Sequence, residues 1–184
     1  MFTPLQTERL TLRLHAPSDI PALMPLIGAR EVAETTLRIP HPYTESDAQG
    51  FMAGTKEELL NGSGLRLGIV VRETDTLCGG GGLRIEPDHR RAELGYWIGV
   101  PFWGKGYATE AARAMVKYGF ETLRLHRIFA SHIVSNSASA KVLRKIGMHH
   151  EGRQRGHILK WGEFLDIEMY GMVASDAELA VHTA

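Results

Sequence analysis

The sequence predicts an α/β domain, because strand-like and helical segments alternate along a single chain of 184 residues. The clearest unit is a strand over 94–100, followed by a tight connection and a helix that begins near Tyr107. An apolar strand over 127–134 comes next, and strand–helix–strand spacing of this kind implies two parallel strands joined by a right-handed crossover. We expect one domain over 1–174, followed by a loose tail over 175–184.

Local patterns predict the elements that precede this unit. Alternating leucines over 10–14 have the period of a half-buried strand. A short helix is expected over 18–30, with Ser18 as its N-cap, and a loop over 31–43, where two prolines argue against regular structure. A second helix is expected over 44–60, because a threonine followed by acidic residues is typical of a helix start.

The remaining elements follow from the same patterns. A hairpin is expected in the middle of the chain, and the four consecutive glycines over 79–82 in its second strand favour a bulge or a close backbone approach. A phosphate loop is the weaker interpretation there, because no helix follows. The expected segments are strands over 65–72, 76–85, 148–158 and 164–173, and a helix over 136–146 that Gly147 ends.

Composition narrows the classes of protein to consider. Lysine and arginine number 21, as do aspartate and glutamate, and this zero net charge argues against direct nucleic-acid binding. The single Cys78 cannot form an internal disulfide, and no stretch approaches the roughly 18 apolar residues of a membrane span. We therefore expect a cytoplasmic protein with no membrane partner.

The connection over 101–108 has the character of a phosphate-binding loop. Gly104 and Gly106 allow close approach to a ligand, and the helix that follows has unpaired N–H groups and a positive dipole end. A dinucleotide fingerprint would need glycine where Thr109 stands, and a P-loop would need Ser or Thr directly after Gly-Lys. The loop therefore suits a pyrophosphate in a setting other than these two nucleotide motifs.

At this point several motifs together resemble the GNAT N-acetyltransferases, which use acetyl-CoA. Those motifs are Ala92-Glu93-Leu94-Gly95-Tyr96-Trp97-Ile98, Trp103-Gly104-Lys105-Gly106-Tyr107-Ala108-Thr109-Glu110-Ala111, Asn136-x-x-Ser139, Val142-Leu143-Arg144-Lys145-Ile146-Gly147-Met148 and Thr7-Glu8-Arg9-Leu10-x-Leu12-Arg13. The combination covers most of residues 5–173 and is similar to the branch that contains the ribosomal-protein N-terminal (alanine/serine) acetyltransferases. The family often has Gln or Arg where this chain has Trp103.

The resemblance implies a mixed central sheet of about six to seven strands, flanked by helices on both faces and with splayed central parallel strands. It also implies acetyl-CoA as co-substrate, without a metal, and direct attack by an amine in a ternary complex. The residues it assigns to the cofactor are Ile98, Val100, Trp103, Gly104, Lys105, Gly106, Tyr107, Ala108, Thr109, Asn136, Ser139 and Arg144. For Asn136 a helix N-cap is an equal interpretation, and for Arg144 a solvated charge at a helix end is the default interpretation.

Two residues are candidates for proton transfer. Glu93 at the start of the central strand could accept the amine proton through water, or could be ion-paired with neighbouring Arg90 and Arg91. Many relatives carry a tyrosine general acid where this chain has Leu143, so Ser139 or a water is the remaining candidate for the acid. Glu110, in the first turn of a helix, is expected to be structural.

The sequence says least about which amine accepts the acetyl group. A lysine amine with a pKa of ~10.4 is rarely neutral at pH 7, whereas an α-amine near ~7.8 is neutral far more often. A site without a strong base therefore favours a peptide or protein N-terminus. The family resemblance implies that the early helices and the loop between them form one wall of the acceptor site, which makes 31–43 the candidate for acceptor recognition, with an ordinary surface loop as an equal interpretation. The alternatives are a small-molecule amine (a polyamine or an antibiotic) and a non-catalytic acyl-CoA-binding module, and a homodimer is compatible with either.

Overall fold

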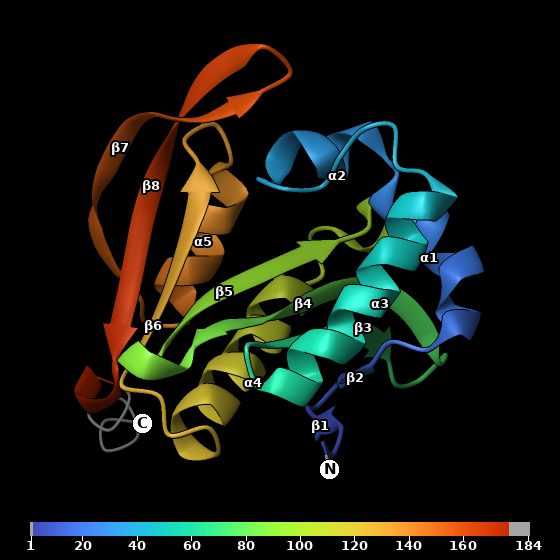
Figure 1. Cartoon of the computed structure of the whole chain (residues 1–184), viewed down its shortest axis with the longest axis horizontal. Coiled ribbons are helices and arrows are strands. Elements are labelled where there is room, and N and C mark those ends of the chain that lie inside the picture. The colour runs from blue at the N-terminus through green and yellow to red at the C-terminus, as the bar shows by residue number, and fades with distance from the viewer. Residues whose placement is uncertain (1, 177–184) are drawn as a thin grey trace.

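The computed structural model describes residues 2–176 and contains an eight-stranded mixed sheet (Figure 1). The strands lie in the order β1-β2-β3-β4-β5-β6-β8-β7. Their bounds are β1 Leu5–Gln6, β2 Leu10–Leu14, β3 Gly64–Val71, β4 Thr76–Glu86, β5 Arg91–Ile98, β6 Arg127–Ile133, β7 His149–Lys160 and β8 Glu163–Val173. The predicted α/β class is confirmed, and the additional strand is the two-residue β1. Of the tail predicted over 175–184, residues 177–184 lie outside the part of the chain that the structure describes.

Helices cover both faces of the sheet (Figure 1). One face carries α1 (Ile20–Ile27), α2 (Arg30–Thr35) and α3 (Glu45–Asn61), and the other carries α4 (Tyr107–Glu121) and α5 (Ser137–Lys145). The larger core lies on the α4 side, where Ala111, Ala112 and Met115 are buried against the strands. The two alanines have little bulk, so α4 can pack closely on the sheet beside the cleft described below.

The central parallel strands separate soon after they meet. The pairing of β5 with β6 extends only from Arg91 opposite Arg127 to Glu93 opposite Phe129. Beyond that point β5 continues along β4 and β6 continues along β8, and Figure 1 shows the two strands diverging. The splay that the family resemblance implied is therefore present, and the rest of β5 lacks a ladder partner on the β6 side.

The structure corrects the prediction for 18–43. Instead of one helix from Ser18, a 3-10 turn (Pro17–Asp19) leads into α1, and the Asp19 carboxylate accepts from the Ala16 N–H at 2.8 Å. Gly28 ends α1, and the extended Ala29 that follows starts α2, so 30–35 is helical where a loop was expected. The two prolines lie after this helix and leave it intact. The predicted second helix is confirmed, with Thr44 as its N-cap.

Two features of the sheet bear on the site. The expected strand 94–100 begins earlier, at Arg91, and ends at Ile98, because Pro101 cannot donate to a ladder and 100–102 form a 3-10 turn. The glycine run is a close approach, as predicted: a Cβ on Gly79 would lie 2.3 Å from the Trp97 carbonyl oxygen, and one on Gly81 would lie 2.8 Å from Met115.

No helix within residues 2–176 is long and apolar enough to cross a membrane.

Candidate active site

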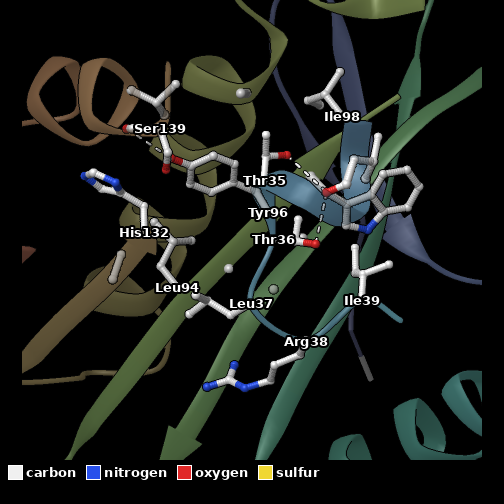
Figure 2. A pocket seen from close by; sticks show the side chains of 18 of the residues that line it. Thr35, Thr36, Leu37, Arg38, Ile39, Leu94, Tyr96, Ile98, His132 and Ser139 are labelled. Atoms are coloured by element: carbon white, nitrogen blue, oxygen red, sulfur yellow. Dashed lines mark hydrogen bonds between the residues drawn. The ribbon is translucent and has the colours of Figure 1, made fainter. Parts of the chain in front are cut away.

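A cleft of about 1210 Å³ opens where β5 and β6 diverge. Side chains alternate along a strand, so Tyr96 and Ile98 of β5 point to the face covered by α4 and α5, whereas Glu93 and Trp97 point to the α1–α3 face. All four residues line the cleft, which therefore connects the two faces of the sheet (Figure 2).

The loop before α4 has the backbone geometry of an anion site. Gly104 and Gly106 have φ values of +76° and +82°, which other residues rarely adopt. Gly106 is the N-cap of α4, so the first N–H groups of the helix lie beside the loop. The Trp103 Nε1–H donates to the Ile98 carbonyl at 2.6 Å and closes the turn that leaves β5. Of the predicted loop residues, 103, 104 and 106–109 line the cleft.

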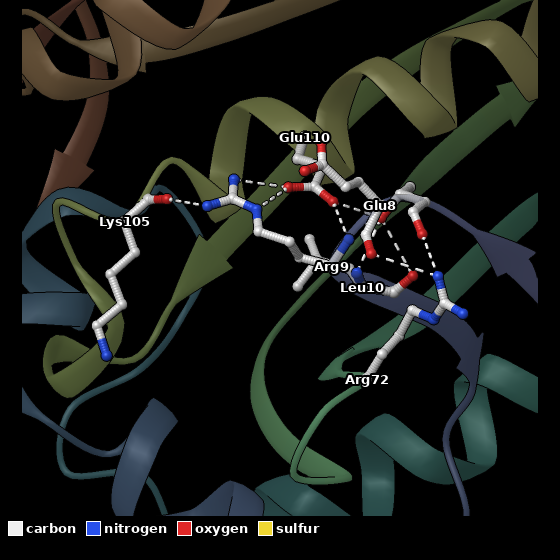
Figure 3. A network of polar contacts seen from close by, with 7 residues as sticks. Glu8, Arg9, Leu10, Arg72, Lys105 and Glu110 are labelled. Atoms are coloured by element: carbon white, nitrogen blue, oxygen red, sulfur yellow. Dashed lines mark hydrogen bonds and ion pairs between the residues drawn. The ribbon is translucent and has the colours of Figure 1, made fainter.

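The loop is braced by the connection between β1 and β2, which explains the motif at residues 7–10 (Figure 3). Arg9 donates through Nε to Glu110 at 2.7 Å and through Nη1 to the Lys105 carbonyl at 2.9 Å. Burial alone would raise the pKa of Glu110, but hydrogen bonds from Thr7 and Arg9 outweigh it, so this pKa lies below its ordinary value. The carboxylate is therefore held as a structural anchor.

Three predicted cofactor residues do not line the cleft. Val100 lies in the 3-10 turn, and Lys105 directs its ammonium over the Phe102 ring. Arg144 lies on α5 but does not line the cleft, whereas Lys141 and Lys145 of the same helix do. Their assignment to the cofactor stays a prediction. Among the described residues, no group of three or more His, Cys, Asp or Glu side chains could hold a metal ion.

Asn136 connects the two halves of the cleft. Its Oδ1 accepts from the Ser139 N–H at 3.0 Å, which confirms the N-cap interpretation. Its Nδ2 donates to the Thr35 carbonyl at 2.9 Å, at the end of α2. Both polar ends of the side chain therefore have protein partners, and Asn136 fixes the start of α5 relative to the opposite wall.

Ser139 has a partner that the sequence interpretation missed. The Tyr96 hydroxyl oxygen lies 2.9 Å from Ser139 Oγ, and Figure 2 shows the phenol ring directed toward that serine. Burial raises the pKa of Tyr96 to about 12, so the phenol keeps its proton at neutral pH. The signal in the sequence was a residue with a polar tip on an otherwise apolar strand face, between Leu94 and Ile98.

Leu143 stands where the family resemblance places a tyrosine acid and has no proton to donate, whereas a buried histidine lines the same cleft. Leu143 lines the cleft but is a fully buried core residue, which leaves only a hydrocarbon surface there. His132 also lines the cleft and is buried, with Nδ1 2.8 Å from the Ile133 carbonyl oxygen. Its Nε2 has no hydrogen-bond partner among the residues that the structure describes.

Glu93 lies on the opposite face in an ion-pair cluster. Its Oε2 accepts from Arg38 at 2.8 Å and from Arg84 at 2.5 Å, and its side chain is only 9% exposed. The alternative partners named from the sequence were wrong: Arg91 pairs with Glu86, and Arg90 donates to a backbone carbonyl. Across the β4–β5 ladder, Arg84 lies directly opposite Glu93, whereas Arg91 lies opposite Glu86.

Beside Glu93 the sheet face is uncovered. Gly95 is exposed in the middle of β5, and a Cβ placed on it would meet nothing within 4 Å. Across the cleft, Gly50 and Gly54 lie one turn apart on α3, and both line the cleft. We call this space, with its floor at Gly95 and its wall at Gly50 and Gly54, the acceptor groove. The segment 35–40 lines its other side and continues the wall that the sequence assigned to 31–43.

Comparisons with known proteins agree with this geometry. Residues 9–149 match a family model described as an acetyltransferase (GNAT) domain. The chain is 34% identical to the uncharacterized N-acetyltransferase p20 of Bacillus licheniformis over 92% of this chain and 95% of that protein. It is 35% identical to the uncharacterized N-acetyltransferase YoaA of Bacillus subtilis over 94% and 98% of the two chains. Among solved structures, RimL, a ribosomal L7/L12 alpha-N-protein acetyltransferase in complex with coenzyme A, superposes with a TM-score of 0.86 over 95% and 99%, at 20% identity.

Proposed function

Because this chain belongs to the GNAT family of N-acetyltransferases, we propose that it transfers the acetyl group of acetyl-CoA to the α-amine of a peptide or protein N-terminus. The amine attacks directly while both substrates are bound. The acceptor groove carries this proposal. Its glycine floor and glycine wall leave an open, elongated surface against a central strand, which suits an extended chain entering end-on.

The cofactor side follows from the loop. When bound, acetyl-CoA supplies the thioester. Residues 103–109 would hold its pyrophosphate with backbone N–H groups at the start of α4. The unpaired edge of β5 after Glu93 offers N–H and C=O groups to the pantetheine arm, as the family resemblance implies for Ile98. RimL, of the same fold, was solved with coenzyme A, which is consistent with a cofactor site in this cleft.

The two proton-transfer groups would act from opposite faces of the sheet. Glu93 accepts the proton that the attacking amine loses, through a chain of waters, while a bond forms between the amine nitrogen and the acetyl carbon. The carbon–sulfur bond then breaks, and the thiolate leaves with the bonding electron pair. Ser139 donates its hydroxyl proton to this thiolate, and the proton taken up at Glu93 returns to the serine oxygen through solvent. Tyr96, which stays protonated, donates to Ser139 Oγ and so leaves the serine proton free to point at the sulfur.

The chemistry of the amine supports the same acceptor class. Both arginine contacts of Glu93 use Oε2, so the two guanidinium groups bind the same carboxylate oxygen. An α-amine with a pKa of ~7.8 is neutral in roughly one molecule in seven at pH 7, and needs little help from a base. A lysine or polyamine amine would need much more.

The test measures coenzyme A release with peptides that begin with Ala, Ser or Met, and with spermidine, after calorimetric titration of acetyl-CoA. We expect turnover on at least one peptide and little on spermidine. The Gly95→Val variant should lose peptide turnover by about tenfold or more while binding acetyl-CoA as before, since the new side chain fills only the groove. Faster turnover of spermidine would overturn the acceptor assignment. Acetyl-CoA binding without turnover of any amine would favour the non-catalytic module.

A further inference from the structure

Two arginines of the groove share one carboxylate. Strand alternation and register place Arg66, Arg84 and Glu93 on the same face of the sheet, and Arg38 reaches them from the loop after α2. Glu58 of α3 pairs with Arg66 through two hydrogen bonds. Arg38 and Arg84 share the single carboxylate of Glu93, so this trio carries one excess positive charge, whereas Arg66 is balanced by Glu58. Asp47, in the first turn of α3, is a further carboxylate that lines the cleft.

The excess charge is available to a ligand. The side chains of Arg38 and Arg84 are 63% and 59% exposed, whereas the carboxylate they share is 9% exposed. A guanidinium has five N–H donors, and in the described part of the chain each of these arginines uses a single nitrogen, Nη2, in its contact with Glu93. Most of their donors therefore have no partner among the residues that the structure describes, and both side chains line the cleft.

The distance from the reacting end fits a short peptide. Glu93, which marks the arginine pair, lies three residues before Tyr96 on β5, a rise of about 10 Å along a strand. In Figure 2, Arg38 lies far along the cleft from Ser139. An extended peptide advances about 3.3–3.6 Å per residue, so a side chain among its first four residues reaches the arginines when its amine is at the thioester.

Resting on the proposed function, we infer that the preferred acceptor is an N-terminus that carries an aspartate or glutamate within its first four residues, bound by Arg38 and Arg84. A carboxylate is the planar anion that a guanidinium fork binds best. The same excess charge repels polycations, so the site selects against polyamines as well as for acidic chains.

The experiment compares three peptides that differ only at position 3: Ala-Ala-Asp, Ala-Ala-Asn and Ala-Ala-Lys, each followed by the same neutral tail. We expect kcat/KM to be about tenfold higher for Asp than for Asn and lowest for Lys, with the difference shrinking as salt rises. Arg38→Gln should reduce the preference for Asp to near unity. Arg38→Glu should reverse it, so that the Lys peptide becomes the best of the three.

Folding is preserved in these variants because Arg84 still pairs with Glu93, and the melting temperature and acetyl-CoA affinity check this. Arg155→Gln is the matched control, since Arg155 is exposed on β7 and does not line the cleft; its peptide preference should equal that of the unmodified protein. Equal kcat/KM for the three peptides, or an Asp preference unchanged in Arg38→Glu, would overturn the inference while the N-terminal acetyltransferase proposal stands. Absence of turnover on every peptide would overturn the proposed function itself.

Discussion

Replacing Tyr96 with phenylalanine removes a hydroxyl that lies 2.9 Å from Ser139 Oγ and leaves the ring packing in place. If this hydroxyl only orients Ser139, its loss should cost about one side-chain hydrogen bond, roughly 1 kcal/mol. That corresponds to about a fivefold fall in kcat. Ser139→Ala should cost about 100-fold, the lower range for a lost general acid.

The double variant separates the two roles. Because Tyr96 would act only through Ser139, adding Tyr96→Phe to Ser139→Ala should cost nothing further, and the double variant should stay about 100-fold down in kcat. Independent contributions would multiply to about 500-fold. The assay is kcat for the four proteins together with the acetyl-CoA Kd by calorimetry. Tyr118→Phe is the control, because Tyr118 lies on α4 against Phe2, away from the cleft. A 500-fold loss would refute the claim that Tyr96 acts through Ser139, and equal losses in kcat and acetyl-CoA affinity in Ser139→Ala would refute the acid role argued for Ser139.

Two further predictions concern the loop and the core. Arg9→Ala should raise the acetyl-CoA Kd about fivefold, because it removes the contact to the Lys105 carbonyl, worth roughly 1 kcal/mol. Arg72→Ala, which frees only the Thr7 and Glu8 carbonyls, should change the Kd less when both are measured by calorimetry, and equal effects would count against the brace. Burial lowers the pKa of His15 from 6.5 to about 4, so between those pH values the unfolded chain binds a proton that the folded chain does not. Stability should therefore fall as pH drops through this window, by about 3 kcal/mol in all. In denaturant titrations from pH 7 to 4, the free energy of unfolding of His15→Phe should change less with pH than that of the unmodified protein. An unchanged pH dependence would contradict its assignment to His15.

Local chemistry was readable from the sequence wherever one element decided it. The Thr44 cap, the Asn136 cap and the glycines at 104 and 106 each follow from the needs of a single helix end or turn, and the structure has all four. The break between α1 and α2 was missed because Gly28 and Ala29 interrupt an otherwise helical pattern, and the prolines drew attention to a later position.

The residue pairs across the cleft were harder to predict from the sequence. The partnership of Arg84 with Glu93 follows from the β4–β5 register, in which Glu86 faces Arg91, so a correct placement of that hairpin would have predicted it. Arg38 comes from a loop whose path depends on where α2 packs, and Tyr96 meets Ser139 only because the packing of α5 on β6 brings the start of that helix beside β5. No local pattern encodes these distances, since tertiary packing sets them.

The arrangement of the two proposed proton-transfer groups follows from a property of sheets. Residues an odd number apart on one strand point to opposite faces, so Glu93 and Tyr96 could not serve one reaction in a continuous sheet. The β5–β6 ladder stops at Glu93, and beyond it the two faces communicate through the cleft. An amine can then approach from the Glu93 face while the sulfur departs on the Ser139 face, which is the in-line geometry that direct transfer requires. By this reasoning, a variant that extended the ladder past Glu93 would keep the acid, the base and the loop and still lose the reaction.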